Sequence, residues 1–366
     1  MRPLCGSASY LICALNELSA QKPDWQFIIL TNRNLYPECY ERITWSQNVR
    51  HIKLGFTSIG LLWYSTHLYF ILRSLNPDFF WAPATLLPPF VPTNVKTIVT
   101  VNDLVSKDYR DTMSFFNRLY SDLLFDRSIM QADILLAISN YTAHAIKTRY
   151  AGRRSEKLVI GCSVDRSLFK PLHLSPSDRT AIAQKYGTVA PFLLFVGTLE
   201  PRKNLDFMLQ LMPQLAANGL RLVVVGASGW CKSKVASIVK QAGYPFHMIT
   251  FAGYVPTADL VKLYNTASIY VSTALNEGFG LPQLEAMNCG CPVVSPHNSA
   301  MIELVEGAGI TVKGWDIDAW CGTILDAYNG RDQYISSGYK RAETYNWPQI
   351  AAEIIKRISD NEVISR

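Results

Sequence analysis

The chain has 366 residues, of which 49% are hydrophobic and 17% are charged. This composition excludes an intrinsically disordered or collagen-like chain, and the length is typical of two domains. The net charge is +6, and residues 1–170 carry all of it, with 19 Lys and Arg against 13 Asp and Glu. A basic first half indicates either an anionic partner, such as a lipid surface or a phosphate-bearing substrate, or ordinary variation of surface charge.

Several classes of protein are excluded by what the sequence lacks. No zinc-finger spacing, RNA-binding aromatic motif or long run of Lys and Arg is present, so we expect no nucleic-acid partner. The eight cysteines include no Cys-x-x-Cys pair, which indicates reduced, buried thiols in a cytosolic protein. No signal-peptide pattern is visible. The most apolar stretch, Ile59 to Leu72, is too short to span a bilayer and predicts a core helix, with an interfacial helix as the alternative.

The first half of the chain alternates helical and strand patterns. Helices are predicted over 10–19, 59–74, 112–131 and 140–149, the last capped by Ser139. Strands are predicted over 26–30, 78–82, 95–101, 133–138 and 158–160. A doubly wound domain usually opens with a strand, whereas the first element here is a helix. We therefore expect that the first strand of this domain is missing, or that Met1 is an internal start.

Residues 163–190 contain several Pro, Ser and Gly residues and predict a linker. The alternation then resumes, with strands predicted over 192–196, 220–225, 248–251, 269–271 and 292–295, a helix over 205–217 and a final amphipathic helix over 347–358. Strands alternating with helices predict parallel sheets that are covered by helices on both faces. The expected fold is α/β, with two doubly wound, Rossmann-like domains facing across a cleft and ligands at the carboxyl ends of the strands.

A glycine and two adjacent cations mark the first candidate site. Gly197 follows the predicted strand 192–196, and Arg202 and Lys203 stand just before the next helix. A glycine at a strand end permits close backbone approach, and cations beside a helix start suit a diphosphate. A solvated basic turn is the alternative interpretation.

A glycine-rich turn between two glutamates marks the second candidate site. Glu277 and Glu285 flank the turn Gly278-Phe279-Gly280-Leu281, and Pro282 is expected at the first helical position. The glycines leave room for a ligand, and the proline leaves the preceding amides free to point at oxygen atoms. Carboxylates accept hydrogen bonds from sugar hydroxyls, often two at once. Two glutamates at this spacing are otherwise usual on a solvated surface, so the turn between them is what favours a ligand.

These two stretches carry a resemblance to a known family. The segments 195–205 (FVGTLEPRKNL) and 277–285 (EGFGLPQLE) resemble the large retaining glycosyltransferase family four, also called group 1 glycosyltransferases. Supporting segments follow in the family's order at 251–255, 285–294 and 303–307. The resemblance covers nearly the whole chain and is strongest over 192–310, and it is the combination of segments that is specific.

The resemblance implies the GT-B fold and sugar transfer with retention at the anomeric carbon. It implies an N-terminal acceptor-binding domain over 1–170, a nucleotide-sugar-binding domain over 171–346, and a last helix over 347–366 that crosses back onto the first domain. It implies no metal and no cofactor, because the nucleotide diphosphate sugar, GDP-mannose or a UDP-sugar, is a substrate. The segment 316–318 matches the Asp-x-Asp of metal-dependent transferases, but it starts a predicted helix, so we expect a helix cap there.

The resemblance also implies roles for individual residues. Arg202 and Lys203 would hold the diphosphate and stabilise its departure, and Glu277 would hold the sugar, which makes these three the expected catalytic residues. Glu285 would bind the ribose hydroxyls. The other donor-binding residues are expected to be Gly197, Gly226, Tyr254, Val255, Gly278, Phe279, Gly280 and Leu281. The corresponding residues on the acceptor side are Gly6, Asn102 and Asp103.

Two stretches depart from the family pattern and leave other interpretations open. Asn102 stands where many relatives have a histidine, and asparagine cannot titrate. The family turn Gly-x-Gly-Arg-Tyr is here Gly6-Ser7-Ala8-Ser9-Tyr10. Both departures fit a degenerate relative that binds a nucleotide sugar without turnover. A third interpretation, a sugar-nucleotide epimerase of similar architecture, is disfavoured by Arg202-Lys203 and the 277–285 pattern.

The expected function is transfer of a sugar from a nucleotide diphosphate sugar, because this is what the family resemblance implies. Mannose is the first choice, since Thr-Leu-Glu-Pro-Arg-Lys-Asn resembles relatives that use GDP-mannose. The expected acceptor is a growing surface polysaccharide or lipid-linked oligosaccharide, and the basic first half fits a lipid diphosphate carrier. We expect a cytoplasmic protein with a peripheral contact at the cytoplasmic face of the inner membrane.

Overall fold

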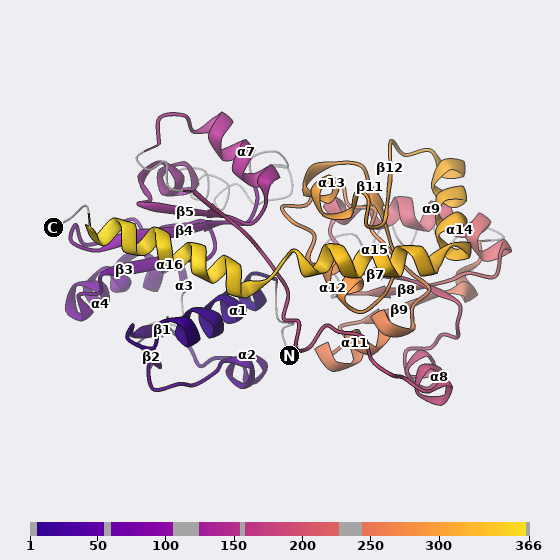
Figure 1. Ribbon diagram of the computed structural model, residues 1–366, viewed down its shortest axis with the longest axis horizontal. Coiled ribbons are helices and arrows are strands. Elements are labelled where there is room, and N and C mark those ends of the chain that lie inside the picture. Colours follow the sequence, from indigo (N-terminus) through magenta and orange to yellow (C-terminus); the bar gives the residue numbers. More distant parts are fainter. Residues whose placement is uncertain (1–5, 55–59, 105–123, 154–157, 227–243, 364–366) are drawn as a thin grey trace. The chain divides into compact units, whose positions relative to one another are not determined.

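The computed structural model describes residues 6–54, 60–104, 124–153, 158–226 and 244–363. The chain forms two compact units (Figure 1). The N-terminal unit joins residues 4–163 to residues 346–366, and the central unit holds residues 164–345. The chain therefore passes from one unit to the other at Ser163/Val164 and again at Tyr345/Asn346.

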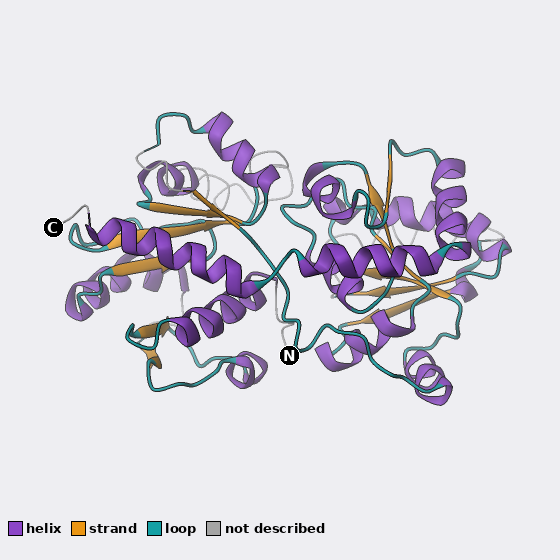
Figure 2. Ribbon diagram, in the orientation of Figure 1, coloured by secondary structure: helices purple, strands orange, loops and turns teal. Residues whose placement is uncertain are grey.

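Parallel strands with helices around them form the N-terminal unit (Figure 2). Its elements are α1 (Gly6–Gln21), β1 (Phe27–Thr31), α2 (Pro37–Arg42), β2 (Val49–Lys53), α3 (Gly60–Leu62), η1 (Trp63–His67), α4 (Leu68–Leu75), β3 (Phe79–Ala82), β4 (Lys96–Val101), β5 (Ile134–Ala137), α7 (Asn140–Arg149), β6 (Leu158–Ile160) and α16 (Trp347–Val363). The described strands make two parallel sheets, β1-β2 and β3-β4-β5-β6. The first described element is the helix α1, as predicted, and residues 1–5 lie outside the described ranges.

The C-terminal helix completes the core of this unit. Ile354 of α16 packs with Leu18 of α1 and Ile134 of β5 in one buried cluster. Trp347, at the start of α16, meets the ring of Tyr10 edge-on, with ring centroids 5.0 Å apart. Apolar residues spaced three and four apart give α16 the single face that this packing requires. The core of the N-terminal unit thus combines residues from the two ends of the chain.

The most apolar stretch folds as α3, a π-helical turn η1 and α4. Trp63, Leu68 and Leu72 form a buried cluster, which confirms the expected core helix, while Phe70 lies on the exposed side. Within the described ranges, no helix combines the length and the apolar character that crossing a membrane requires.

The central unit contains one six-stranded parallel sheet. Its elements are α8 (Pro176–Lys185), β7 (Phe192–Val196), η3 (Pro201–Lys203), α9 (Leu205–Ala217), β8 (Arg221–Val225), η4 (Phe246–Met248), β9 (Ile249–Gly253), α11 (Thr257–Thr266), β10 (Ile269–Val271), α12 (Leu281–Asn288), β11 (Val293–Pro296), α13 (Ser299–Val305), β12 (Ile310–Val312), α14 (Ile317–Asn329) and α15 (Arg331–Glu343). The strand order is β12-β11-β10-β7-β8-β9. The chain moves outward from β7 in one direction and from β10 in the other, so the pair β7/β10 is a topological switch point, where sheets of this kind bind ligands.

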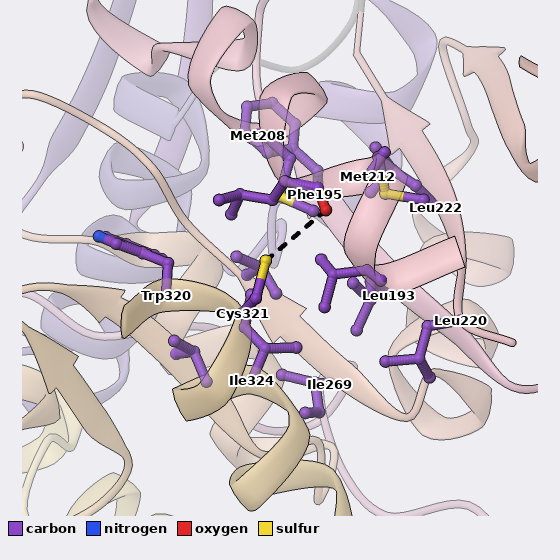
Figure 3. Packing of buried hydrophobic residues seen from close by; sticks show 14 of the residues in the cluster. Leu193, Phe195, Met208, Met212, Leu220, Leu222, Ile269, Trp320, Cys321 and Ile324 are labelled. Carbon is purple, nitrogen blue, oxygen red and sulfur yellow. Dashed lines mark hydrogen bonds between the residues drawn. The ribbon is translucent and has the colours of Figure 1, made fainter. Parts of the chain in front are cut away.

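Apolar residues from strands and from helices fill the core of the central unit (Figure 3). Leu193 and Phe195 come from the continuous apolar run of β7, which is typical of a strand buried on both faces. Met208 of α9 and Ile324 of α14 come from helical patterns and lie against them. The Sγ atom of Cys321 approaches the carbonyl oxygen of Leu211 at 3.7 Å, in keeping with the expected buried thiol.

Most predicted elements are confirmed to within a few residues, but some differ. The expected linker over 163–190 contains the helix α8, which begins with a capping box between Ser175 and Asp178. Neither β2 nor β12 was predicted, because each is short and β2 (VRHIK) carries charges instead of an apolar run. Of the predicted helix over 112–131, residues 124–131 are helical and the rest lie outside the described ranges.

Candidate functional site

Four loops converge at the carboxyl edge of the six-stranded sheet. They follow the adjacent strands β10, β7, β8 and β9, whose carboxyl ends share one edge because all of the strands are parallel. The loop after β7 carries Arg202 and Lys203, and β8 ends at Gly226. The loop after β9 carries residues 254–255, and the loop after β10 carries residues 277–280. The fold therefore brings Arg202, Lys203 and residues 277–280 together at the switch point and places the residues of the other two loops at the same edge of the sheet.

Two glycines allow the loops after β7 and β8 to touch. A Cβ atom at Gly226 would stand 1.9 Å from the carbonyl oxygen of Gly197, so a side chain has no room there. The amide of Gly226 donates to the carbonyl oxygen of Gly253 at 2.8 Å. A Cβ atom at Gly197 would lie 3.1 Å from Cε of Lys203, so this glycine makes room for the lysine side chain.

Glu277 binds both cations of the loop after β7. The guanidinium of Arg202 donates from Nη1 to Oε2 of Glu277 and to the carbonyl oxygen of Asn276, both at 2.8 Å. The ammonium of Lys203 donates to the other carboxylate oxygen, Oε1. The side chains of Arg202, Lys203 and Glu277 are 20%, 13% and 11% exposed, respectively. We call this group the Arg202–Glu277–Lys203 triad.

The triad keeps its carboxylate charged. Burial alone would raise the pKa of Glu277, but the attraction of Lys203 and Arg202 outweighs burial and holds this pKa below its usual value of 4.5. At neutral pH the triad therefore carries one net positive charge in a largely buried setting. Fixed cations that also donate hydrogen bonds can receive an anionic group such as a diphosphate.

Backbone and hydroxyl hydrogen bonds fix the triad between the loops. The amide of Leu275 donates to the carbonyl oxygen of Arg202 at 2.8 Å. The hydroxyl of Thr273 donates to the carbonyl oxygens of Lys203 and Asn204, at 3.1 and 2.9 Å. These hydrogen bonds join the loop after β10 to the cationic turn, and Thr273 takes part in them although the sequence did not single it out.

Ser299 is a second residue that was not singled out. Its hydroxyl accepts a hydrogen bond from the backbone amide of Glu277 at 3.1 Å. Its φ of 48° is in the left-handed region, which a residue with a side chain adopts at a cost in backbone strain. The preceding Asn298 also donates to the carbonyl oxygen of Leu275, at 3.2 Å. In the sequence, Asn298-Ser299 lies shortly after the predicted strand 292–295. Such a pair fits a helix start, but it does not reveal that Ser299 contacts Glu277.

The glycine turn leads from Glu277 into α12. Gly280 has a φ of 103°, which favours glycine, and it directly precedes the helix. Pro282 is the second residue of α12, one position later than expected, and still lies where its missing amide is harmless. Phe279 is buried, and its ring meets that of Tyr345 edge-on at 5.3 Å between centroids. The turn is thereby anchored at the point where the chain leaves the central unit.

Glu285 is half-buried and lies on α12, the helix that follows the glycine turn. Its Oε2 atom accepts a hydrogen bond from the hydroxyl of Tyr264 on α11, at 2.9 Å. Val255 is buried and Tyr254 is partly exposed in the loop after β9. Because Tyr254 and Val255 follow β9, they lie at the same carboxyl edge of the sheet as the triad, on the side of β8 and β9.

The expected acceptor-side residues lie in the N-terminal unit. Gly6 is the exposed first residue of α1, and Asn102 and Asp103 directly follow β4. The amide Nδ2 of Asn102 donates to the hydroxyl of Ser7 at 3.3 Å. The two stretches that depart from the family pattern therefore contact each other.

The first aspartate of the Asp-x-Asp segment caps a helix. The side chain of Asp316 accepts a hydrogen bond from the amide of Ala319 at 2.8 Å, which confirms the expected cap of α14. Asp318 accepts a hydrogen bond from Gln214 at 2.6 Å. In the part of the chain that the structure describes, no three His, Cys, Asp or Glu side chains are grouped so as to hold a metal ion.

Comparison with known proteins gives a family for the central part of the chain. Residues 190–329 match the family Glycosyl transferases group 1. This match spans β7 to the end of α14, and it includes the triad and Glu285. It confirms the expected resemblance to group 1 glycosyltransferases over the segment that carries the candidate site.

Two similar proteins from Escherichia coli are mannosyltransferases by name. The chain is 28% identical to O-antigen chain mannosyltransferase B over 295 residues, which are 78% of this chain and 74% of that protein. It is 27% identical to the serotype-specific mannosyltransferase WbdA over 217 residues, which are 57% of this chain. The match spans only 26% of that second protein.

A solved structure shares the fold over nearly the whole chain. HepE of Anabaena, determined in complex with UDP and glucose, superposes with a TM-score of 0.72 and 18% identity. The match covers 98% of this chain and 96% of that one. This likeness confirms the expected GT-B fold with two Rossmann-like domains.

Proposed function

We propose that this chain, which contains a group 1 glycosyl transferase domain at residues 190–329, transfers a sugar from a nucleotide diphosphate sugar with retention at the anomeric carbon. The first choice of sugar is mannose, since both named Escherichia coli relatives are mannosyltransferases. The proposed acceptor is a growing surface polysaccharide or lipid-linked oligosaccharide, reached at the cytoplasmic face of the inner membrane.

The observation that carries the proposal is the Arg202–Glu277–Lys203 triad at the switch point. Two fixed cations stand within hydrogen-bond reach of one carboxylate, in a largely buried setting. A diphosphate leaving group gains negative charge as its bond to the sugar breaks, and preorganised cations stabilise that charge. Arg202 and Lys203 are proposed to do this, and they supply the positive charge that a metal ion supplies in other transferases.

The carboxylate is proposed to have its own task. When the diphosphate takes over contacts with the cations, Glu277 turns from a counter-ion into a hydrogen-bond acceptor for the hydroxyls of the sugar. The amides of Phe279, Gly280 and Leu281 are proposed to hold the same sugar from the start of α12. Retention without an enzyme nucleophile is explained by attack on the face that the leaving phosphate occupies, with that phosphate helping to take the acceptor proton.

Release of nucleotide diphosphate tests the proposal. The full chain is incubated with a panel of nucleotide sugars, with and without a lipid acceptor extract, and we expect GDP release from GDP-mannose when the extract is present. Lys203→Ala should lower the rate by roughly 100-fold or more, the order seen when one stabilising donor is removed. The matched control is Lys185→Ala, an exposed lysine that pairs with Asp259 in the same unit.

Two outcomes would overturn the proposal in different ways. Equal rates for Lys203→Ala and Lys185→Ala would refute the assignment of the triad to the donor diphosphate. Tight binding of a nucleotide sugar by the wild-type chain without any release, even with acceptor extract, would favour the degenerate relative.

A further inference from the structure

We propose that Tyr264 is a positioning residue for Glu285, and that their hydrogen bond fixes the carboxylate that recognises the ribose of the nucleotide. This inference rests on the proposed function, because it takes Glu285 as the residue that meets the ribose hydroxyls. Tyr264 itself would touch neither the nucleotide nor the sugar.

The contact joins two helices of the central unit. Tyr264 lies on α11, and its hydroxyl donates to Oε2 of Glu285 on α12 at 2.9 Å. Tyr264 is fully buried, whereas Glu285 is half-buried. A buried tyrosine hydroxyl needs a hydrogen-bond partner, and here the partner is the residue at the edge of the candidate site.

Aromatic neighbours restrict the ring that carries this hydroxyl. Phe169 meets Tyr264 edge-on with centroids 6.2 Å apart, and Tyr270 of β10 lies at 5.9 Å with a tilted ring. The segment that contributes Phe169 is itself tied to α11, because the amide of Leu172 donates to Oδ1 of Asn265 at 2.7 Å. The tyrosine therefore offers its donor from a fixed place.

The chemistry of the pair keeps the direction of the hydrogen bond constant. Burial, and next the negative charge of Glu285, hold the pKa of Tyr264 well above its usual value of 10. The hydroxyl thus stays protonated at neutral pH and donates to the carboxylate. A carboxylate that accepts this bond on Oε2 keeps lone pairs on both oxygens for further donors.

A fixed carboxylate matters for the recognition of two neighbouring hydroxyls. A glutamate side chain has three rotatable bonds, and its two carboxylate oxygens bind two vicinal ribose hydroxyls together only when the planar group is held in one orientation. Holding the side chain before the ligand arrives lowers the cost of binding. Loss of the tyrosine hydroxyl should therefore weaken the selection of ribose and leave the other nucleotide contacts intact.

Isothermal titration with a matched pair of nucleotides tests this. The wild-type chain and Tyr264→Phe are titrated with GDP and 2′,3′-dideoxy-GDP, or with the uridine pair if the wild type binds UDP instead. We expect the wild type to prefer the ribonucleotide, and Tyr264→Phe to reduce that preference about tenfold, the order set by one hydrogen bond to a charged group. The dideoxy nucleotide should bind both proteins equally.

Two further variants separate positioning from damage to the fold. Tyr244→Phe also removes a hydroxyl from the central unit, one that donates to the carbonyl oxygen of Leu209 at 2.8 Å, and should leave the ribose preference unchanged. In a Glu285→Gln background, Tyr264→Phe should have no further effect on the preference. A full ribose preference in Tyr264→Phe overturns the positioning role alone. A wild-type chain that binds nucleotide without any ribose preference overturns the assignment of Glu285 and with it this inference.

Discussion

Glu277→Gln keeps the shape of the side chain but removes the carboxylate that Arg202 and Lys203 share, and Arg202 keeps only the more distant carboxylate of Glu200, at 3.9 Å. Breaking a buried ion pair in this way costs about 3–5 kcal/mol of folding free energy. Because the side chains of the two cations keep 20% and 13% of their exposure, we expect the lower end, about 3 kcal/mol at pH 7.

The same substitution should change how stability depends on pH. The pKa of Glu277 lies below 4.5 in the folded state, and 4.5 is its value in the unfolded chain. A lowered folded pKa stabilises the fold at pH above the unfolded value, and this stabilisation is lost as the pH falls through the folded pKa. The difference in free energy of unfolding between wild type and Glu277→Gln should therefore be constant near neutral pH and shrink below 4.5.

Urea unfolding of the full chain, followed by tryptophan fluorescence from neutral to acid pH, measures this difference. The control is Glu353→Gln, which breaks an exposed pair with Arg357 at 2.9 Å and should cost only about 0.3–0.5 kcal/mol. The reasoning is refuted if Glu277→Gln costs no more than the control at pH 7, or if its cost does not change with pH.

Three further perturbations have defined outcomes. Gly226→Ala places a Cβ atom 1.9 Å from a carbonyl oxygen, so Tm and nucleotide binding should both fall, whereas Gly322→Ala, with no atom within 4 Å of the added Cβ, should leave both intact. Asp316→Ala removes a helix cap and should lower the free energy of unfolding by about 1 kcal/mol in urea titrations; a loss of sugar transfer in assays with and without Mg²⁺ would contradict the cap assignment. Burial raises the pKa of Cys321 to about 11 and that of Cys291 to about 12. Mass spectrometry after alkylation at pH 8 should therefore find both thiols protected in the folded chain and modified in urea, and equal modification in both states would argue against their burial.

Local patterns predicted where Gly197, the two cations and the glycine turn after Glu277 lie, whereas Tyr254 and Val255 were expected from the family resemblance. The apolar run of β7 ends at Gly197, and the cations follow before an amphipathic helix. Parallel strands place their carboxyl ends on one edge, so the sequence order of these loops already implies that they meet. The strand order that puts β10 beside β7 was not needed for that expectation, but it explains why Glu277 and the cations are immediate neighbours.

The contacts that tune the site could not be predicted, because they join residues far apart in the sequence. Lys203 and Glu277 are separated by 74 positions, and Glu277 and Ser299 by 22. No local pattern encodes which hydroxyl meets which amide, since this depends on how helices pack on the sheet. The same holds for the contact between Asn102 and Ser7, which joins two departures from the family pattern that are 95 positions apart.

The two strands that escaped prediction owe their place to backbone pairing with a neighbouring strand and not to a long apolar run of their own. Val49–Lys53 contains Arg, His and Lys, and it is a strand because its backbone pairs with β1 along five positions. Ile310–Val312 is only three residues long and gains its place at the edge of the sheet from pairing with β11. In contrast, α8 carried a Ser-Pro start and an aspartate three residues after the serine, a helix signal inside a segment whose prolines suggested a linker.

The closing helix α16 has a consequence for the order in which the chain folds during synthesis. Proteins usually fold their first domain while the ribosome is still making the next. Here the buried cluster of Leu18 and Ile134 also contains Ile354 of α16, so the core of the N-terminal unit is complete only when this helix is present. The half of the chain that is synthesised first therefore receives its last core helix only after the whole central unit has been synthesised.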